Sequence, residues 1–431
     1  MAQDDLSDRD RSGFNRRNLL KSGAGVAAAA LGESLFSSPA LAAGGPPEVK
    51  GAKLGFIALT DAAPLIVAKE LGLFAKYGMP DVQLVKQASW GATRDNLVLG
   101  SGGGGIDGAH LLTPMAYFLT LGVQARTTPI SILARLNTNG QGISVDKEYL
   151  AAKADLNAGK MKGIIAQKKA SGKKITMAMT FPGGTHDLWI RYWLAAGGID
   201  PDKDVDLITV PPPQMVANMK AGTMDAFCVG EPWNAQLVDQ KLGYTAVSTG
   251  QMWMNHPEKS FSMRSDWVAA HPNAAIAITA AIIEAQKWAD NPANVSRLAM
   301  MISGRDYLKV PVGDIASRLQ GNFAMGDGRN IPNAPFKMKF LAGHASFPFK
   351  SHDLWFLVEN QRWGKLPMNL NRGATIAKVN RADIWRAAAA KVGGVPVPPG
   401  DSRGPERFFD GKTFDPGKPD AYLASLGIKR V

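Results

Sequence analysis

The chain has 431 residues, enough for roughly two or three domains. Hydrophobic residues make up 45% of it and charged residues 20%, a composition typical of globular proteins and not of disordered, collagen-like or coiled-coil chains. The 49 basic and 37 acidic residues leave a net charge of +12, which favours anionic partners. A single cysteine, Cys228, excludes internal disulfides and any metal site built on several cysteines.

Residues 1–42 have the pattern of an export signal. Arg16 and Arg17 form a twin-arginine motif, and a mildly apolar stretch that is too short to span a membrane follows it. Ala40-Leu41-Ala42 supplies the small residues of a cleavage site. The pattern predicts a signal peptide, export by the twin-arginine pathway and a periplasmic mature chain. No later segment approaches about 18 uninterrupted apolar residues, so we expect a mature chain that is not embedded in the membrane.

The mature chain alternates strand and helix patterns, which predicts an α/β fold with mainly parallel sheets. Residues 52–59 are an apolar run typical of a buried strand. Thr60 and Asp61 then predict the N-terminal cap of a helix that carries Pro64 in its first turn and ends at Gly78.

The sequence contains no convincing motif for catalysis or for cofactor binding. Residues 103–108 formally fit the G-x-G-x-x-G pattern, but a dinucleotide loop needs a strand before it and a helix after it. Here a helical pattern precedes the glycines (93–99) and a strand pattern follows them (106–112), so we expect a loop that ends a helix. The six histidines lack metal-ligand spacing, and no G-x-S-x-G motif occurs. We therefore expect no cofactor, no metal and no enzymatic activity.

An internal repeat predicts two similar α/β lobes. In each copy a strand, a helix and a second strand follow one another, and the second strand ends in Thr113-Pro114 or in Glu231-Pro232. The matched strand segments are 81–85 and 106–114, and then 204–208 and 224–232. Ligands of α/β sheets bind beyond the carboxyl ends of strands, so we expect Trp90-Gly91 and Pro211–Pro213 to face each other across a cleft between the lobes.

The predicted domain organisation returns to the first lobe after passing through the second. The expected segments are a signal peptide (1–42), lobe 1 (43–150), lobe 2 (151–257), a return to lobe 1 with C-terminal helices (258–392), and an irregular tail packed on the body (393–431). A strand pattern at 260–267 and a helical pattern at 272–289 open the return segment. Seven lysines between 153 and 174 lack interleaved aromatic residues and predict a solvated surface without nucleic-acid binding.

Seven short stretches resemble the nitrate-binding proteins of ATP-binding-cassette (ABC) importers, which have bicarbonate-binding relatives. These stretches are 56–65, 86–91, 93–100, 106–110, 211–218, 228–233 and 255–259. The resemblance covers essentially residues 50–431 and implies a two-lobe periplasmic binding protein of the type II-like class, with a ligand cleft between two mainly parallel sheets. It also implies a monomer that delivers its ligand to a membrane permease and an ATPase. Cyanobacterial members are typically anchored through a lipidated cysteine. This leader has no cysteine, and from this departure we expect a free periplasmic form.

The resemblance also implies which residues contact nitrate. They are Trp90, Gly91, Gln141, His186, Pro212, Val229 and Lys259. Nitrate is planar, carries one diffuse negative charge, and accepts hydrogen bonds without donating any, so indole, carboxamide, imidazole and ammonium N–H groups suit it. Thr113 and Glu231 are second-tier candidates. The carboxylate of Glu231 would repel nitrate if it faced the anion.

Other interpretations stay open at this point. Trp90 could be a core residue, His186 a structural histidine, and Gln141 and Lys259 ordinary surface residues. Bicarbonate carries an O–H group and needs an acceptor, and its binding proteins are implied to use calcium with a carboxylate near the position of Lys259; a lysine there favours nitrate without metal. Nitrite and cyanate are possible ligands, and a nitrate sensor with a regulatory partner or an exported enzyme are alternative functions. If Lys259 binds the anion, its loss should weaken binding with little effect on the stability of the free protein.

Overall fold

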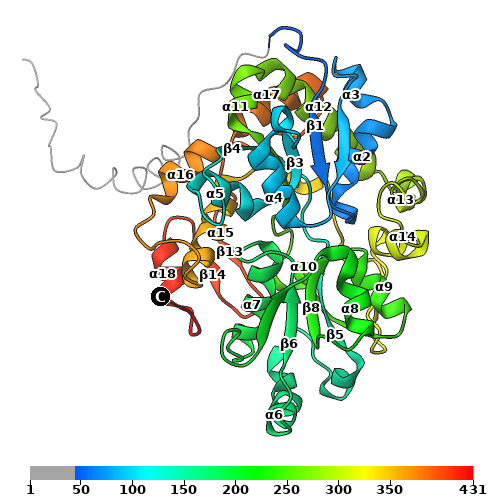
Figure 1. The fold of residues 1–431 in the computed structure, drawn as a ribbon, viewed down its shortest axis with the longest axis vertical. Helices are drawn as coiled ribbons and strands as arrows, with labels where there is room; N and C mark the ends of the chain where they lie inside the picture. The colour runs from blue at the N-terminus through cyan, green and yellow to red at the C-terminus, as the bar shows by residue number, and fades with distance from the viewer. Residues whose placement is uncertain (1–43, 431) are drawn as a thin grey trace, which may run out of the picture. The chain divides into compact units, whose positions relative to one another are not determined.

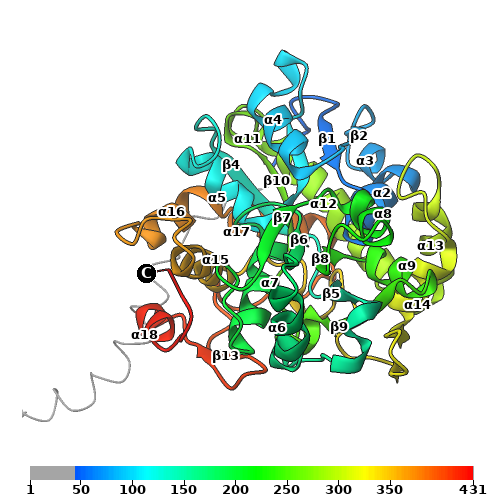
Figure 2. The same cartoon turned by 60° about the horizontal axis from the view of Figure 1, so that its bottom comes forward.

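The computed structural model describes residues 44–430, so the predicted signal peptide lies outside the described residues. This part of the chain is an α/β protein with two five-stranded sheets, and helices cover the faces of both (Figures 1 and 2).

The first sheet has the strand order β2-β1-β3-β10-β4. Its strands are β1 (Lys53–Phe56), β2 (Gln83–Lys86), β3 (Gly108–Leu112), β4 (Ile130–Arg135) and β10 (Lys259–Arg264). β1 pairs in parallel with β2 and β3, whereas β10 lies antiparallel between β3 and β4. Four strands therefore run in one direction and β10 runs in the other.

The second sheet repeats this arrangement, with the strand order β7-β6-β8-β5-β9. Its strands are β5 (Gln141–Asp146), β6 (Thr176–Met179), β7 (Asp206–Thr209), β8 (Ala226–Gly230) and β9 (Gly243–Ser248). β6 pairs in parallel with β7 and β8, and β5 lies antiparallel between β8 and β9. The matching topology confirms the internal repeat and the mainly parallel strand direction.

The chain passes between the sheets twice, and each time it enters a sheet through the antiparallel strand. The first passage lies between β4 and β5, ahead of the expected lobe boundary at residue 150, because β5 pairs with two strands of the second sheet. The second passage lies between β9 and β10. The two crossing segments touch each other, since Thr138 forms a β-bridge with Pro257 and the Asn139 N–H donates to the carbonyl of His256 at 3.2 Å.

The helices of the first lobe are α2 (Ala63–Glu70), α3 (Leu73–Lys76), α4 (Trp90–Leu99), α5 (Thr113–Leu121), α11 (Ser265–Ala270), α12 (Pro272–Ala289), α16 (Arg372–Val379) and α17 (Ala382–Val392). The longest of them, α12, packs against α2, α17 and β4. Those of the second lobe are α6 (Lys162–Ala170), α7 (Thr185–Ala196), α8 (Met215–Lys220), α9 (Trp233–Asp239) and α10 (Thr249–Met252). No helix between residues 44 and 430 combines the length and the apolar character that a membrane span requires.

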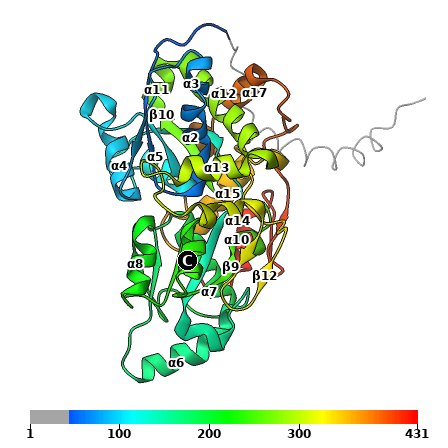
Figure 3. The same ribbon diagram turned by 90° about the vertical axis from the view of Figure 1, so that its right-hand side faces the viewer.

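Two further groups of elements connect the lobes. α13 (Val295–Ser303) packs on α2 of the first lobe (Figure 3), while α14 (Val312–Gln320) packs on α9 of the second. α15 (Lys350–Arg362), all of whose residues are buried, contacts both α5 and α7. The C-terminal segment packs against this region through Phe408, whose ring lies 4.8 Å from that of Trp253 and 5.8 Å from that of Trp355.

The predicted cap after the first strand is wrong in its detail. Thr60–Ala62 form a short 3₁₀ helix, and α2 begins at Ala63 without a capping side chain. The carboxylate of Asp61 instead contacts His110 and Lys259, because both are buried beside it and an ammonium binds a carboxylate more strongly than a backbone N–H does. The predicted helix also breaks at Gly72, which has a φ of 67°, and α3 ends before Gly78.

Candidate functional site

Lys259 is the first residue of β10, and its side chain is fully buried. Backbone pairing places it opposite Leu112, the last residue of β3, so it lies at the carboxyl end of the parallel strands. This is the end at which α/β sheets bind ligands. The ammonium contacts four polar groups that come from both lobes. Nζ lies 3.0 Å from Asp61 Oδ2, 2.9 Å from Glu258 Oε2, 3.3 Å from Gln141 Oε1 and 3.4 Å from His186 Nε2.

The residues around this ammonium form one hydrogen-bonded group, which we call the Lys259 cluster. It consists of Asp61, His110, Gln141, His186, Glu258 and Lys259. Asp61, His110, Glu258 and Lys259 belong to the first lobe or to the crossing segment before β10, and Gln141 and His186 belong to β5 and α7. The cluster therefore joins the two lobes.

The carboxylate of Asp61 is held by three side chains of the cluster. It accepts hydrogen bonds from His110 Nε2 at 2.7 Å and Gln141 Nε2 at 3.1 Å, and it pairs with the ammonium of Lys259. Burial alone would raise the pKa of Asp61, but Lys259 and His110 together hold it below its usual range. Asp61 is therefore ionised at neutral pH.

Glu258 shares the ammonium of Lys259 with Asp61, and its other donors, which include the hydroxyl of Thr185, are uncharged. Its Oε1 accepts from Trp189 Nε1 at 3.1 Å and its Oε2 accepts from Lys259 Nζ at 2.9 Å. Burial raises the pKa of Glu258, and Lys259 offsets only part of this rise. For Lys259 itself, burial would lower the pKa, but Asp61 and Glu258 raise it above its usual value, so the side chain is an ammonium ion.

The two histidines of the cluster are neutral. Burial and the charge of Lys259 hold the pKa of His186 well below its usual value, and burial lowers the pKa of His110 in spite of Asp61. The His186 Nε2 atom lies 2.7 Å from the side-chain oxygen Oε1 of Gln141, which can only accept, so we assign the proton to this nitrogen. Its Nδ1 then accepts from the hydroxyl of Thr180 at 2.5 Å.

Trp90 lies beside the cluster as the first residue of α4. Its ring lies 5.9 Å from the Lys259 ammonium and 5.3 Å from the ring of His110. The indole Nε1 is buried and has no hydrogen-bond partner among the described residues, and the same holds for Oγ1 of Thr60. A buried donor without an acceptor costs about 1–3 kcal/mol, so these atoms indicate a place where an added acceptor would be stabilised. The first turns of α4 and α7 also lie here, and helix N-termini favour negative charge.

Comparisons with known proteins show the family of this chain. A sequence model of the NMT1-like family matches residues 45–303. The chain belongs to the NMT1-like family. It is 54% identical to the nitrate/nitrite binding protein NrtA of Synechococcus elongatus over 97% of this chain and 99% of that protein. It is 44% identical to the bicarbonate-binding protein CmpA of the same organism, over 91% of this chain and 90% of that protein.

This NMT1-like chain is also similar to a solved structure and to a transport ATPase. The crystal structure of the periplasmic nitrate-binding protein NrtA from Synechocystis PCC 6803 is 54% identical, covers 89% of this chain and 100% of that one, and superimposes with a TM-score of 0.87. The nitrate import ATP-binding protein NrtC of Synechocystis is 36% identical over 88% of this chain and 55% of its own length. The resemblance to nitrate-binding proteins and the two-lobe fold expected from the sequence are thus confirmed.

The structure brings four of the predicted site residues together. Gln141, His186 and Lys259 belong to the cluster, and Trp90 lies against it. Val229 precedes Gly230, which lies against the cluster, because a Cβ atom on Gly230 would stand 2.6 Å from Gln141 Oε1. Gly91 and Pro212 offer no polar side chain; Gly91 lies in the first turn of α4 and Pro212 is buried in the turn after β7 (Pro212–Gln214).

The second-tier residues have structural partners. The hydroxyl of Thr113 donates to the carbonyl of Glu258 at 2.7 Å and so positions that residue. The carboxylate of Glu231 lies 3.4 Å from Arg318, while its backbone carbonyl accepts from the N–H of Thr60 at 2.8 Å. Sequence reasoning missed the side chains of Asp61, His110 and Glu258, although all three lie within or beside the stretches that carry the family resemblance.

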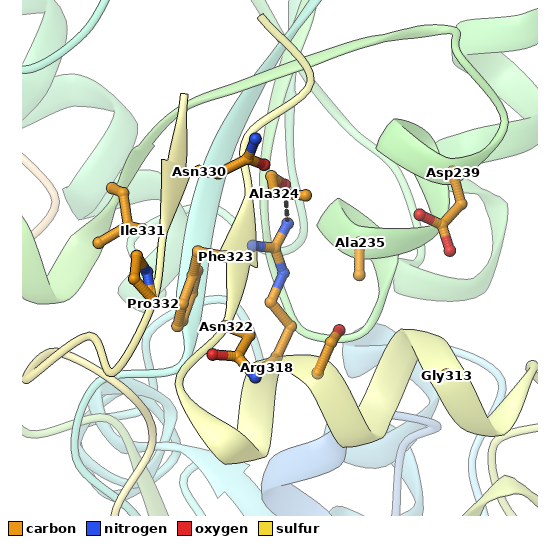
Figure 4. Close-up of a pocket in the computed structure, with 11 residues that line it drawn as sticks. Ala235, Asp239, Gly313, Arg318, Asn322, Phe323, Ala324, Asn330, Ile331 and Pro332 are labelled. Atoms are coloured by element: carbon orange, nitrogen blue, oxygen red, sulfur yellow. Dashed lines mark hydrogen bonds between the residues drawn. The ribbon is translucent and has the colours of Figure 1, made fainter. Parts of the chain in front are cut away.

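A cavity of about 650 Å³ lies elsewhere, between α9, α14 and the hairpin of β11 (Phe323–Ala324) and β12 (Asn330–Ile331) (Figure 4). Arg318 lies across it and donates to the carbonyl of Ala324 at 3.0 Å. None of the Lys259 cluster lines this cavity. Within residues 44–430, no group of three or more His, Cys, Asp or Glu side chains is arranged to hold a metal ion.

Proposed function

We propose that this protein is the solute-binding component of an ABC importer that captures nitrate, or nitrite, in the periplasm and delivers it to a membrane permease and an ATPase. The observation that carries the proposal is a fully buried ammonium in contact with side chains of both lobes, beside a buried indole N–H that has no partner among the described residues. Such a site can hold a small anion only when the lobes are together. The names of the NrtA relatives and of NrtC support nitrate and the importer.

In this proposal nitrate contacts Trp90, Gly91, Gln141, His186, Pro212, Val229 and Lys259. The ammonium and the indole, carboxamide and imidazole N–H groups donate to the three oxygens, and the remaining residues shape the space around them. The protein binds its ligand as a monomer, without catalysing a reaction, after export by the twin-arginine pathway.

Bicarbonate is the second candidate, and one observation favours it. Asp61 and Glu258 are acceptors beside Lys259, and a bicarbonate O–H group needs an acceptor. The bicarbonate-binding relative CmpA supports the same alternative.

Calorimetric titration of the chain without its predicted signal peptide separates these candidates. The ligands are nitrate, nitrite, cyanate, and bicarbonate with and without calcium. We expect heat from nitrate or nitrite without calcium. Bicarbonate binding that requires calcium, together with no heat from nitrate, would show that the nitrate proposal is wrong.

A further inference from the structure

The Lys259 cluster contains more negative than positive groups. One ammonium faces two carboxyl groups, at 3.0 Å (Asp61) and 2.9 Å (Glu258), and all three side chains are fully buried. With both carboxyl groups ionised and both imidazoles neutral, the cluster carries one net negative charge. A monovalent anion that enters this space would be repelled, and in a buried site solvent screens the repulsion only weakly.

One added proton would remove this repulsion, and Glu258 is the group best placed to accept it. Asp61 already accepts from His110, Gln141 and Lys259, and these donors stabilise its ionised form. His186 faces the ammonium of Lys259, which disfavours a second positive charge there. Glu258 accepts from Lys259 and from two neutral donors, the indole of Trp189 and the hydroxyl of Thr185, while its burial and the negative charge of Asp61 favour the neutral acid.

Within residues 44–430, the other titratable groups around Glu258 are poorer acceptors for this proton. The titratable or charged side chains that act on it or lie next to it are Asp61, Lys259, His186, His256 and Cys228. Burial holds the pKa of His256 at about 3 and raises that of Cys228 well above its usual value, so both keep their neutral forms from pH 5 to 9.

We propose that Glu258 is a specificity-determining residue of the anion site, and that a monovalent anion binds together with one proton, which Glu258 takes up. Charge balances, because one anion and one proton enter and the net charge of the cluster is unchanged. The protonated carboxyl group gains an O–H donor that can face an anion oxygen, where the carboxylate would repel it. A divalent anion would need a second proton, for which only Asp61 or an imidazole remains. This inference rests on the proposed function, since nitrate is its test ligand.

The test is to count protons during nitrate binding to the wild-type chain. Nitrate is titrated in two buffers with different heats of ionisation, at several values between about pH 5.5 and about pH 9. Nitrate itself does not titrate in this range, so any exchanged proton belongs to the protein. We expect uptake to rise towards one proton per nitrate as the pH rises, with the Kd constant at low pH and weakening about tenfold per pH unit above it.

Two variants assign the proton. Glu258→Gln should bind nitrate without proton uptake and with a Kd that does not change over the range. Glu406→Gln is the matched control: Glu406 also accepts from an indole N–H, that of Trp253 at 2.6 Å, but lies outside the cluster, so this variant should keep the wild-type uptake. No uptake by the wild type at any pH, or unchanged uptake by Glu258→Gln, would overturn the inference while leaving nitrate binding in place. Wild-type protein that gives no heat with nitrate at any pH would instead overturn the proposed function and this inference with it.

Discussion

Lys259 has a structural task as well as a proposed binding task, because its ammonium neutralises Asp61 and Glu258 in the protein interior. This differs from the expectation that its loss leaves the stability of the free protein unchanged. The expectation treated the side chain as an exposed cation in an open cleft, whereas it is fully buried and paired.

Lys259→Met should therefore have two effects. Nitrate affinity should fall by about 10- to 150-fold, which corresponds to a charged hydrogen bond of about 1.5–3 kcal/mol. The free energy of unfolding should fall by about 3–5 kcal/mol, since the carboxylates lose their buried counter-ion. Nitrate titration and chemical denaturation measure the two quantities. Lys76→Met, which breaks the exposed pair with Glu284, is the control and should change either quantity by less than about 1 kcal/mol. Equal affinities of Lys259→Met and wild type would contradict a role of Lys259 in binding.

His256 gives the stability of the protein a pH dependence. It is fully buried, donates from Nδ1 to the carbonyl of Pro257 at 2.9 Å, and has its pKa lowered by burial to about 3. In the unfolded chain its pKa is about 6.5. A group whose pKa is lower in the folded state contributes stability that is complete above the unfolded pKa and is lost as the pH falls towards the folded pKa.

The free energy of unfolding should thus drop by roughly 2 kcal/mol for this residue alone between pH 6.5 and pH 5, at about 1.4 kcal/mol per pKa unit. Urea denaturation at several pH values measures the drop. His256→Gln, which cannot titrate, should show a smaller drop than wild type over the same range. A drop for His256→Gln as large as that of wild type would contradict a buried neutral imidazole at this position.

At the scale of elements, the strands could be predicted because their apolar runs are local, and α12 was found with its bounds of 272 and 289. β5 could not be assigned to its lobe, because its pairing with β8 and β9 depends on residues far along the chain. The same limit applies to the site. The sequence offered Asp61 as a helix cap, and only the fold brings Lys259 from a distant strand to compete for that carboxylate.

The end of β8 limits the space around Gln141. A Cβ atom on Gly230 would stand 2.6 Å from Gln141 Oε1 and 3.4 Å from Asp61 Oδ2. Gly230→Ala should displace the carboxamide and weaken nitrate binding by about tenfold, the value of one hydrogen bond of about 1.4 kcal/mol. Gly163→Ala in α6, where nothing lies within 4 Å, is the matched control and should bind as wild type does. Both are measured by nitrate titration, and equal affinity of Gly230→Ala would mean that Gln141 does not contact the anion.

At the scale of the whole molecule, a ligand held by both lobes should stabilise the folded chain. At about a hundredfold excess of nitrate over its Kd the gain should be about 2.7 kcal/mol, which appears as a higher melting temperature. Sulfate at equal ionic strength is the control, because a divalent anion should not bind. A melting temperature that nitrate leaves unchanged at millimolar concentration would count against binding.

Complete burial of the Lys259 cluster has a consequence for the speed of ligand exchange. Asp61, Gln141, His186, Glu258 and Lys259 expose 1% or less of their surface, so an anion reaches them only while the lobes are apart. The observed association rate should therefore stop increasing at high ligand concentration and level off at the rate of lobe opening. Nitrate and nitrite should reach the same maximum rate, because the opening of the lobes sets this rate and the identity of the anion does not.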